Sequence, residues 1–145
     1  MQTGGRAPLD HPIGQYEGRR PMQDVKVRLS TLWVFMLLNY LYCDVMGLYD
    51  STLSGGLSRD ALLAASLLME LPILMVLGSR MLDYRPNRWA NVMAGGFMAV
   101  VQVATLFVGS GPTVYYVFFS AIEIACLLFI VWTAWRWAQP VAAVA

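Results

Sequence analysis

Four apolar runs dominate this chain of 145 residues and restrict the folds open to it. They cover approximately residues 30–49, 61–80, 90–109 and 113–134, and each is close to the ~20 residues that cross a bilayer core as a helix. Inside lipid, a segment must satisfy its own backbone hydrogen bonds, which favours helices. We therefore predict an all-α integral membrane protein, folded as a four-helix up-down bundle with short connections.

The composition agrees with a membrane protein. Hydrophobic residues make up 58% of the chain and charged residues 13%, whereas soluble domains average about 25% charged residues. The lipid bilayer is the expected partner, and no nucleic-acid partner is expected from a net charge of +1.

The distribution of basic residues predicts the orientation. Nine of the ten Lys and Arg residues map to the N-terminal segment, the second connection or the C-terminal end, and only Arg59 maps to the other side. By the positive-inside rule, the N- and C-termini are both predicted to be cytoplasmic. The five Trp residues map to the cytoplasmic ends of the spans, whereas Tyr49, Tyr115 and Tyr116 map to the outer ends. The predicted location is the inner (cytoplasmic) membrane of the cell, as a multi-pass protein.

The ends of the chain are predicted to lie outside the bundle. Residues 1–25 are polar and rich in Gly, Pro and charge, which is typical of a flexible cytoplasmic tail. The transmembrane domain is predicted to cover residues 26–138, followed by a C-terminal tail over 139–145. The tail lacks the order of a secretory signal, so the first span is expected to remain in the mature protein, and Met22 is an alternative start to Met1.

Five segments of the chain resemble a known family. The segments read KVRLSTLW (26–33), NYLYCD (39–44), MELP (69–72), RPNRWAN (85–91) and YYVFFSAIE (115–123). Together they resemble an uncharacterised family of short bacterial four-span integral membrane proteins, a domain of unknown function, over about residues 24–137. The resemblance supports the topology and implies no activity, ligand or catalytic residue.

Three carboxylates interrupt the apolar runs. Glu70 and Glu123 lie in the middle of their runs, and Asp44 lies inside a third. A charged carboxylate at the bilayer centre costs about 2.5–3.5 kcal/mol even on the lenient insertion scale, and is rarely kept without a role.

Polar or small residues form one stripe on each predicted helix. Positions three or four apart share a helical face, and the stripes contain Tyr40 with Asp44, Ser66 with Glu70, Asn91 with Gln102, and Tyr116 with Ser120 and Glu123. Because such stripes face lipid only at a cost, we predict that they converge in the bundle interior as a shared acidic pocket. The candidate ligand- or ion-binding residues are Glu70, Glu123, Asp44, Gln102, Tyr40, Tyr116 and Ser120.

The pocket has more than one interpretation. The first is transport or binding of a cation, a proton or an amine-bearing small molecule, in a protein small enough to favour a homo-oligomer. The second is an accessory or scaffolding subunit of a larger membrane complex, with the short loops and the basic cytoplasmic face as docking surfaces. For the two Glu side chains themselves, the alternative to a functional role is that both are protonated and only hydrogen-bond between helices. A third is a lipid-modifying enzyme that uses the buried carboxyls as acid and base, although no motif indicates catalysis and no catalytic residue is assigned.

The remaining features predict contacts rather than chemistry. Arg80, Arg85 and Arg88 are juxtamembrane and are expected to contact anionic lipid headgroups on the cytoplasmic side. Cys43 and Cys126 are interpreted as small packing residues at different depths. His11 is the only histidine, and no zinc-ligand spacing is present, so no metal and no cofactor are expected.

Overall fold

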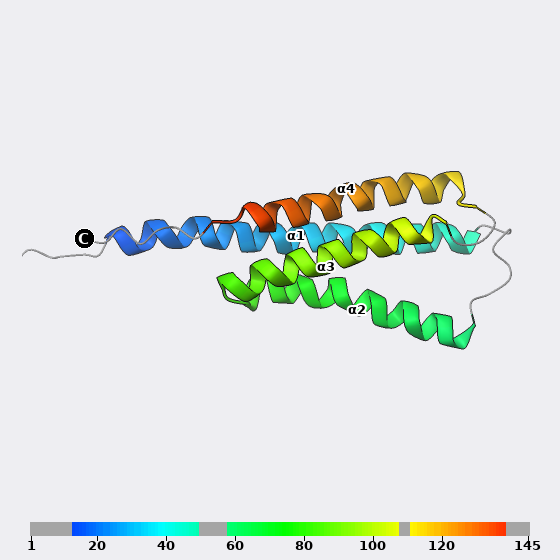
Figure 1. The fold of residues 1–145 in the computed structure, drawn as a ribbon, viewed down its shortest axis with the longest axis horizontal. Helices are drawn as coiled ribbons and strands as arrows, with labels where there is room; N and C mark the ends of the chain where they lie inside the picture. Colours follow the sequence, from blue (N-terminus) through cyan, green and yellow to red (C-terminus); the bar gives the residue numbers. More distant parts are fainter. Residues whose placement is uncertain (1–12, 50–57, 108–110, 139–145) are drawn as a thin grey trace, which may run out of the picture.

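The computed structural model describes residues 13–49, 58–107 and 111–138, and these form four helices. In chain order they are α1 (Ile13–Tyr49), α2 (Arg59–Met81), α3 (Tyr84–Thr105) and α4 (Val114–Arg136) (Figure 1). The described residues contain no strand. The prediction of an all-α, four-helix protein is therefore confirmed.

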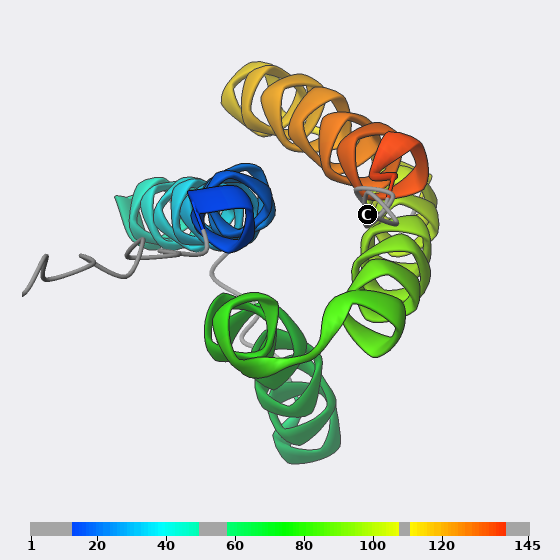
Figure 2. The same ribbon diagram turned by 90° about the vertical axis from the view of Figure 1, so that its left-hand side faces the viewer.

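The helices form a closed cycle of neighbours. Helix α1 packs against α2 and α4, and α3 packs against α2 and α4. The end-on view in Figure 2 shows the four helices arranged around a ring in that order. Helices α2 and α3 lie close together near the short connection that joins them. Toward the N-terminus of α2, the two helices diverge (Figure 1). We call the end with the α2–α3 connection the basic end, and the opposite one the far end.

Three helices are long and apolar enough to cross a membrane. They are α2, α4 and the part of α1 from Met22 to Tyr49. Helix α3 is outside this set because it begins in the basic connection and carries the polar residues Asn87, Asn91 and Gln102. Four spans and the orientation of the termini therefore stay predictions.

The first helix begins earlier than the sequence indicated. We predicted a flexible tail over residues 1–25; in the structure α1 begins at Ile13 and includes residues 13–25. Once a helix is nucleated, each further residue adds one backbone hydrogen bond, so a span readily extends into polar sequence. At 37 residues α1 is about 55 Å long, and it extends past the other three helices at the basic end (Figure 1). Residues 1–12 and the predicted tail 139–145 lie outside the described residues.

The third helix also differs from its predicted bounds. The third apolar run was predicted to begin at about residue 90, but Arg85-Pro86-Asn87 already lies in the first turn of α3. Proline is tolerated there because the first backbone N–H groups of a helix have no partner within it. The chain turns instead at Leu82 and Asp83, which have extended backbone angles and cap the two helices.

A buried polar network joins three helices near the basic end. Trp33 Nε1 in α1 donates to Asn91 Oδ1 in α3 at 2.7 Å, and Ser79 Oγ in α2 donates to the same oxygen at 3.2 Å. Asn91 Nδ2 donates to Asn87 Oδ1 at 2.7 Å, and Asn87 Nδ2 donates to the Ser79 carbonyl oxygen at 2.6 Å. All four side chains have 0% of their surface exposed. Because each polar group has a partner, the network fixes how α1, α2 and α3 pack.

Helices α3 and α4 approach each other closely at one glycine. A Cβ added to Gly95 would lie 2.9 Å from Val131 Cγ2 and 3.6 Å from the Leu127 carbonyl oxygen. A Cβ on the adjacent Gly96 would meet nothing within 4 Å. Only Gly95 is therefore needed for the contact between these two helices.

Candidate functional site: a buried carboxyl below the far-end pocket

Glu123 is the most deeply buried carboxylate among the described residues. It lies in the middle of α4 with 1% of its surface exposed, and its Oε1 has no hydrogen-bond partner in the protein. Buried polar atoms are normally paired, so each exception needs an explanation. An unpaired carboxyl oxygen in an apolar bundle is the strongest sign of a binding position in this molecule.

Helix α1 provides several groups in the neighbourhood of this carboxyl. Tyr40 and Cys43, one turn apart, both lie within electrostatic range of Glu123. The hydroxyl of Tyr40 is also buried without a partner. Asp44 is close enough to act electrostatically on Glu123. Two polar atoms without partners therefore lie in one region between α1 and α4, with a second carboxylate nearby.

A pocket of about 590 Å³ opens next to this region at the far end. Its walls come from α1, α2 and α4, and they include Cys43, Asp44, Ser66, Met69, Tyr115 and Tyr116. Its α2 residues belong to the first half of that helix, the part that diverges from the bundle (Figure 1). Glu123 does not line the pocket, but Cys43 and Asp44, which do, both lie within electrostatic range of it.

A chain of hydrogen bonds closes the side of the site between α3 and α4. Gln102 Nε2 donates to Ser120 Oγ at 2.9 Å. Thr105 Oγ1 donates to the Gln102 carbonyl oxygen at 2.8 Å, and the Tyr116 hydroxyl donates to Thr105 Oγ1 at 2.6 Å. Gln102 and Ser120 therefore act as contacts between helices, whereas Tyr116 also lines the pocket.

The structure does not bring Glu70 into this site. We predicted that Glu70 faces the bundle interior with Glu123, but its side chain is exposed. The buried residues of α2 are Pro72, Met75 and Ser79. At ~100° of rotation per residue, they lie roughly 140–200° around the helix from Glu70. Ser66 and Glu70 share one helical face, but the buried residues of α2 lie on another face.

The comparison with protein families covers nearly the whole chain. The model of a family of unknown function, DUF6326, matches residues 17–144. The chain belongs to this family. No curated protein and no solved structure matches it.

Within this DUF6326 chain, sequence reasoning missed three residues of the pocket. Cys43 was interpreted as a packing residue, and Ser66 and Tyr115 were not proposed as site residues, although all three line the pocket. A signal was present for Ser66, because it lies four residues before Glu70 on the divergent part of α2. No group of three or more His, Cys, Asp or Glu side chains that could hold a metal ion occurs in the part of the chain that the structure describes.

Proposed function

We propose that this chain is a membrane protein that binds, and moves across the bilayer, a cationic species in the far-end pocket. The candidates are a proton, an inorganic cation or an amine-bearing small molecule. The observation that carries the proposal is Glu123, which is buried with an unpaired Oε1 and lies within electrostatic range of Asp44, a second carboxylate that lines the pocket.

The chemistry of the pocket favours a positive ligand. Asp44 is exposed at the pocket wall and provides the first negative charge. Tyr115 and Tyr116 add aromatic surface, and aromatic faces attract cations. An ammonium group would form charge-assisted hydrogen bonds with a carboxylate, and these are about twice as strong as neutral ones.

The order of the groups suggests a path. A cation entering at the far end would meet Asp44 first and Glu123 next, since Asp44 is exposed and lines the pocket, whereas Glu123 is buried. The free Tyr40 hydroxyl could serve as a further ligand at the depth of Glu123. With Gln102 and Ser120 bonded to each other, the path would run between α1 and α4.

We also propose the location and orientation that the sequence predicts. The chain would lie in the inner membrane with the basic end in the cytoplasm and the pocket opening outward. The asymmetry of Lys and Arg residues supports this orientation.

The test is flux and binding with the purified full chain in liposomes. The probes are protons, Na⁺, K⁺ and ethylammonium, each added on one side. We expect the wild type to bind or move at least one probe and Glu123→Gln to abolish it. The matched control is Glu70→Gln, which removes the same charge from an exposed position and should leave the activity unchanged. Absence of every activity in the wild type, or full activity in Glu123→Gln, would contradict the proposal.

The exposed Glu70 favours a second candidate function, an accessory subunit or homo-oligomer in which another membrane protein covers α2. A carboxylate on a lipid-facing surface is costly, so a partner at this position would stabilise it. Native mass spectrometry of the membrane-extracted protein tests this candidate. We expect Glu70→Leu to release the partner and Asp60→Leu, in the first turn of the same helix, to retain it. A monomer in mild detergent for the wild type and both variants would argue against assembly.

A further inference from the structure

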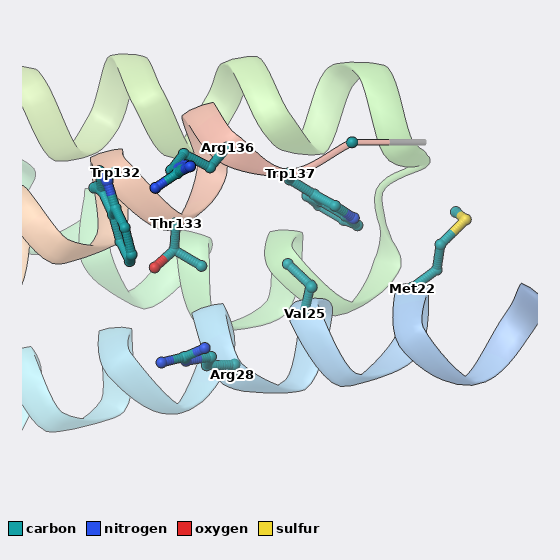
Figure 3. Close-up of a pocket in the computed structure, with 8 residues that line it drawn as sticks. Met22, Val25, Arg28, Trp132, Thr133, Arg136 and Trp137 are labelled. Atoms are coloured by element: carbon teal, nitrogen blue, oxygen red, sulfur yellow. The ribbon is translucent and has the colours of Figure 1, made fainter. Parts of the chain in front are cut away.

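A second pocket, distinct from the acidic one, lies at the basic end. It has a volume of about 310 Å³ and is formed by the first part of α1 and the last part of α4. Among the residues that the structure describes, the charged residues that line it are Arg28 from α1 and Arg136 from α4, and none of the lining residues is a carboxylate. Figure 3 shows these two arginine side chains on either side of Thr133. The pocket therefore has the opposite charge to the far-end pocket.

Aromatic rings of α4 hold both guanidinium groups. Arg28 Cζ lies 5.0 Å from the centroid of the Phe129 ring, and Arg136 Cζ lies 5.4 Å from that of Trp132. Stacking of this kind fixes the plane of a guanidinium and leaves its edge, with the N–H donors, free to bind another group. The two planar donors are thus oriented before any ligand enters.

A third donor lies between them. Thr133 lines the same pocket, and its Oγ1 is buried without a hydrogen-bond partner. A threonine hydroxyl inside a helix commonly bonds to a carbonyl three or four residues earlier, but this one does not. A buried hydroxyl without a partner needs one, and a ligand in the adjacent pocket would provide it.

We propose that Arg28, Arg136 and Thr133 form a binding site for a phosphate group. A planar guanidinium matches the geometry of phosphate oxygens, and two of them with one hydroxyl provide donors for a tetrahedral anion. Trp132, Trp137 and Val25 add apolar lining, which suits the glycerol or alkyl part of a phosphate ester. The phosphate belongs to a phospholipid headgroup or is free in solution.

This site differs from the headgroup contacts expected for the second connection. Two of those three arginines are engaged in contacts within the protein. Arg80 Nε donates to Ser30 Oγ at 3.0 Å, and Arg88 Nη2 donates to the Trp135 carbonyl oxygen at 2.9 Å. Arg88 also stacks on Trp135, with its Cζ 5.7 Å from the ring centroid. In contrast, Arg28 and Arg136 face a pocket.

The experiment measures binding to the purified full chain in a neutral detergent. Dioctanoyl phosphatidic acid represents the lipid headgroup, inorganic phosphate represents the free ion, and dioctanoyl phosphatidylcholine is the zwitterionic control. The readout is the intrinsic Trp fluorescence, because Trp132 and Trp137 line the pocket, with native mass spectrometry to count bound lipids. We expect saturable binding of one phosphatidic acid.

The variants are Arg28→Gln, Arg136→Gln and Thr133→Val, with Arg59→Gln at the far end as a control for charge. Each arginine variant loses a charge-assisted contact, so we expect it to bind phosphatidic acid at least about tenfold more weakly. We expect a smaller loss of affinity for Thr133→Val and no loss for Arg59→Gln. Competition by inorganic phosphate assigns the site to the free ion, and its absence assigns it to the lipid headgroup. Equal affinity in Arg59→Gln and the double variant Arg28→Gln/Arg136→Gln would overturn the proposal. If an arginine variant unfolds, the proposal is tested by comparing the affinity of Thr133→Val with that of Thr133→Ser, which keeps the hydroxyl.

Discussion

The indole of Trp33 in α1 and the side-chain amide of Asn91 in α3 are joined by a 2.7 Å hydrogen bond across the interior of the bundle. Trp33 and Asn91 are 58 positions apart in the sequence, and both are fully buried. Asn91 accepts from Ser79 of α2 as well. One amide oxygen therefore holds three helices together at the basic end.

Replacing Asn91 by Leu should destabilise the protein by about 2–4 kcal/mol, because the Trp33 and Ser79 donors would be buried without a partner. The measurement is unfolding of the purified protein in mixed detergent micelles. Asn39→Leu is the matched control, since Asn39 bonds only to the Phe35 carbonyl oxygen of its own helix. Equal losses of stability in the two variants would show that the network does not hold the helices.

Replacing Gly95 by Ala should cost about 1–3 kcal/mol, since the new methyl group would overlap Val131 and force α3 and α4 apart. Gly96→Ala should be neutral or stabilising by up to about 1 kcal/mol, because alanine favours the helix and the added methyl group enters open space. Thermal unfolding of the two variants in the same detergent checks the sign of each effect. A loss of stability in Gly96→Ala as large as in Gly95→Ala would contradict the packing seen here.

Tyr40→Phe should leave the stability of the ligand-free protein unchanged or slightly raised, because the removed hydroxyl is buried without a partner. Tyr116→Phe should instead cost about 1 kcal/mol, since its hydroxyl donates to Thr105. If the Tyr40 hydroxyl is a ligand, only Tyr40→Phe weakens cation binding without lowering stability. Unfolding and binding measured on the same samples separate the two effects.

Cys43 should react with a small, membrane-impermeant methanethiosulfonate faster than Cys126. Cys43 lines the far-end pocket, whereas Cys126 packs in the core with its Sγ 3.9 Å from the Leu32 carbonyl oxygen. Serine variants that keep one cysteine at a time allow the two rates to be measured by mass spectrometry. In sealed vesicles of known orientation, modification of Cys43 from the outer side only would support the proposed topology. Faster reaction of Cys126 would show that the pocket does not admit solvent.

The amino-acid sequence by itself determined the elements of this protein. In lipid, an apolar run of about 20 residues can satisfy its backbone hydrogen bonds only as a helix. The four helices, and the central part of each, therefore followed from the length and the pattern of the apolar runs. The segments KVRLSTLW and RPNRWAN already indicated the family, and they contain Trp33, Asn87 and Asn91 of the buried network.

The tertiary structure decided which polar residues meet. Helical spacing places Glu70 and Glu123 each on a face, but it does not say which face turns inward, because that depends on how neighbouring helices pack. Helix α2 buries Pro72, Met75 and Ser79, which leaves Glu70 outside, while α4 turns Glu123 toward Tyr40. The pairing of Arg28 with Arg136 likewise depends on α1 extending beyond its apolar run to meet the end of α4. The periodic pattern of a sequence describes one helix at a time, whereas a site is formed by side chains from several helices.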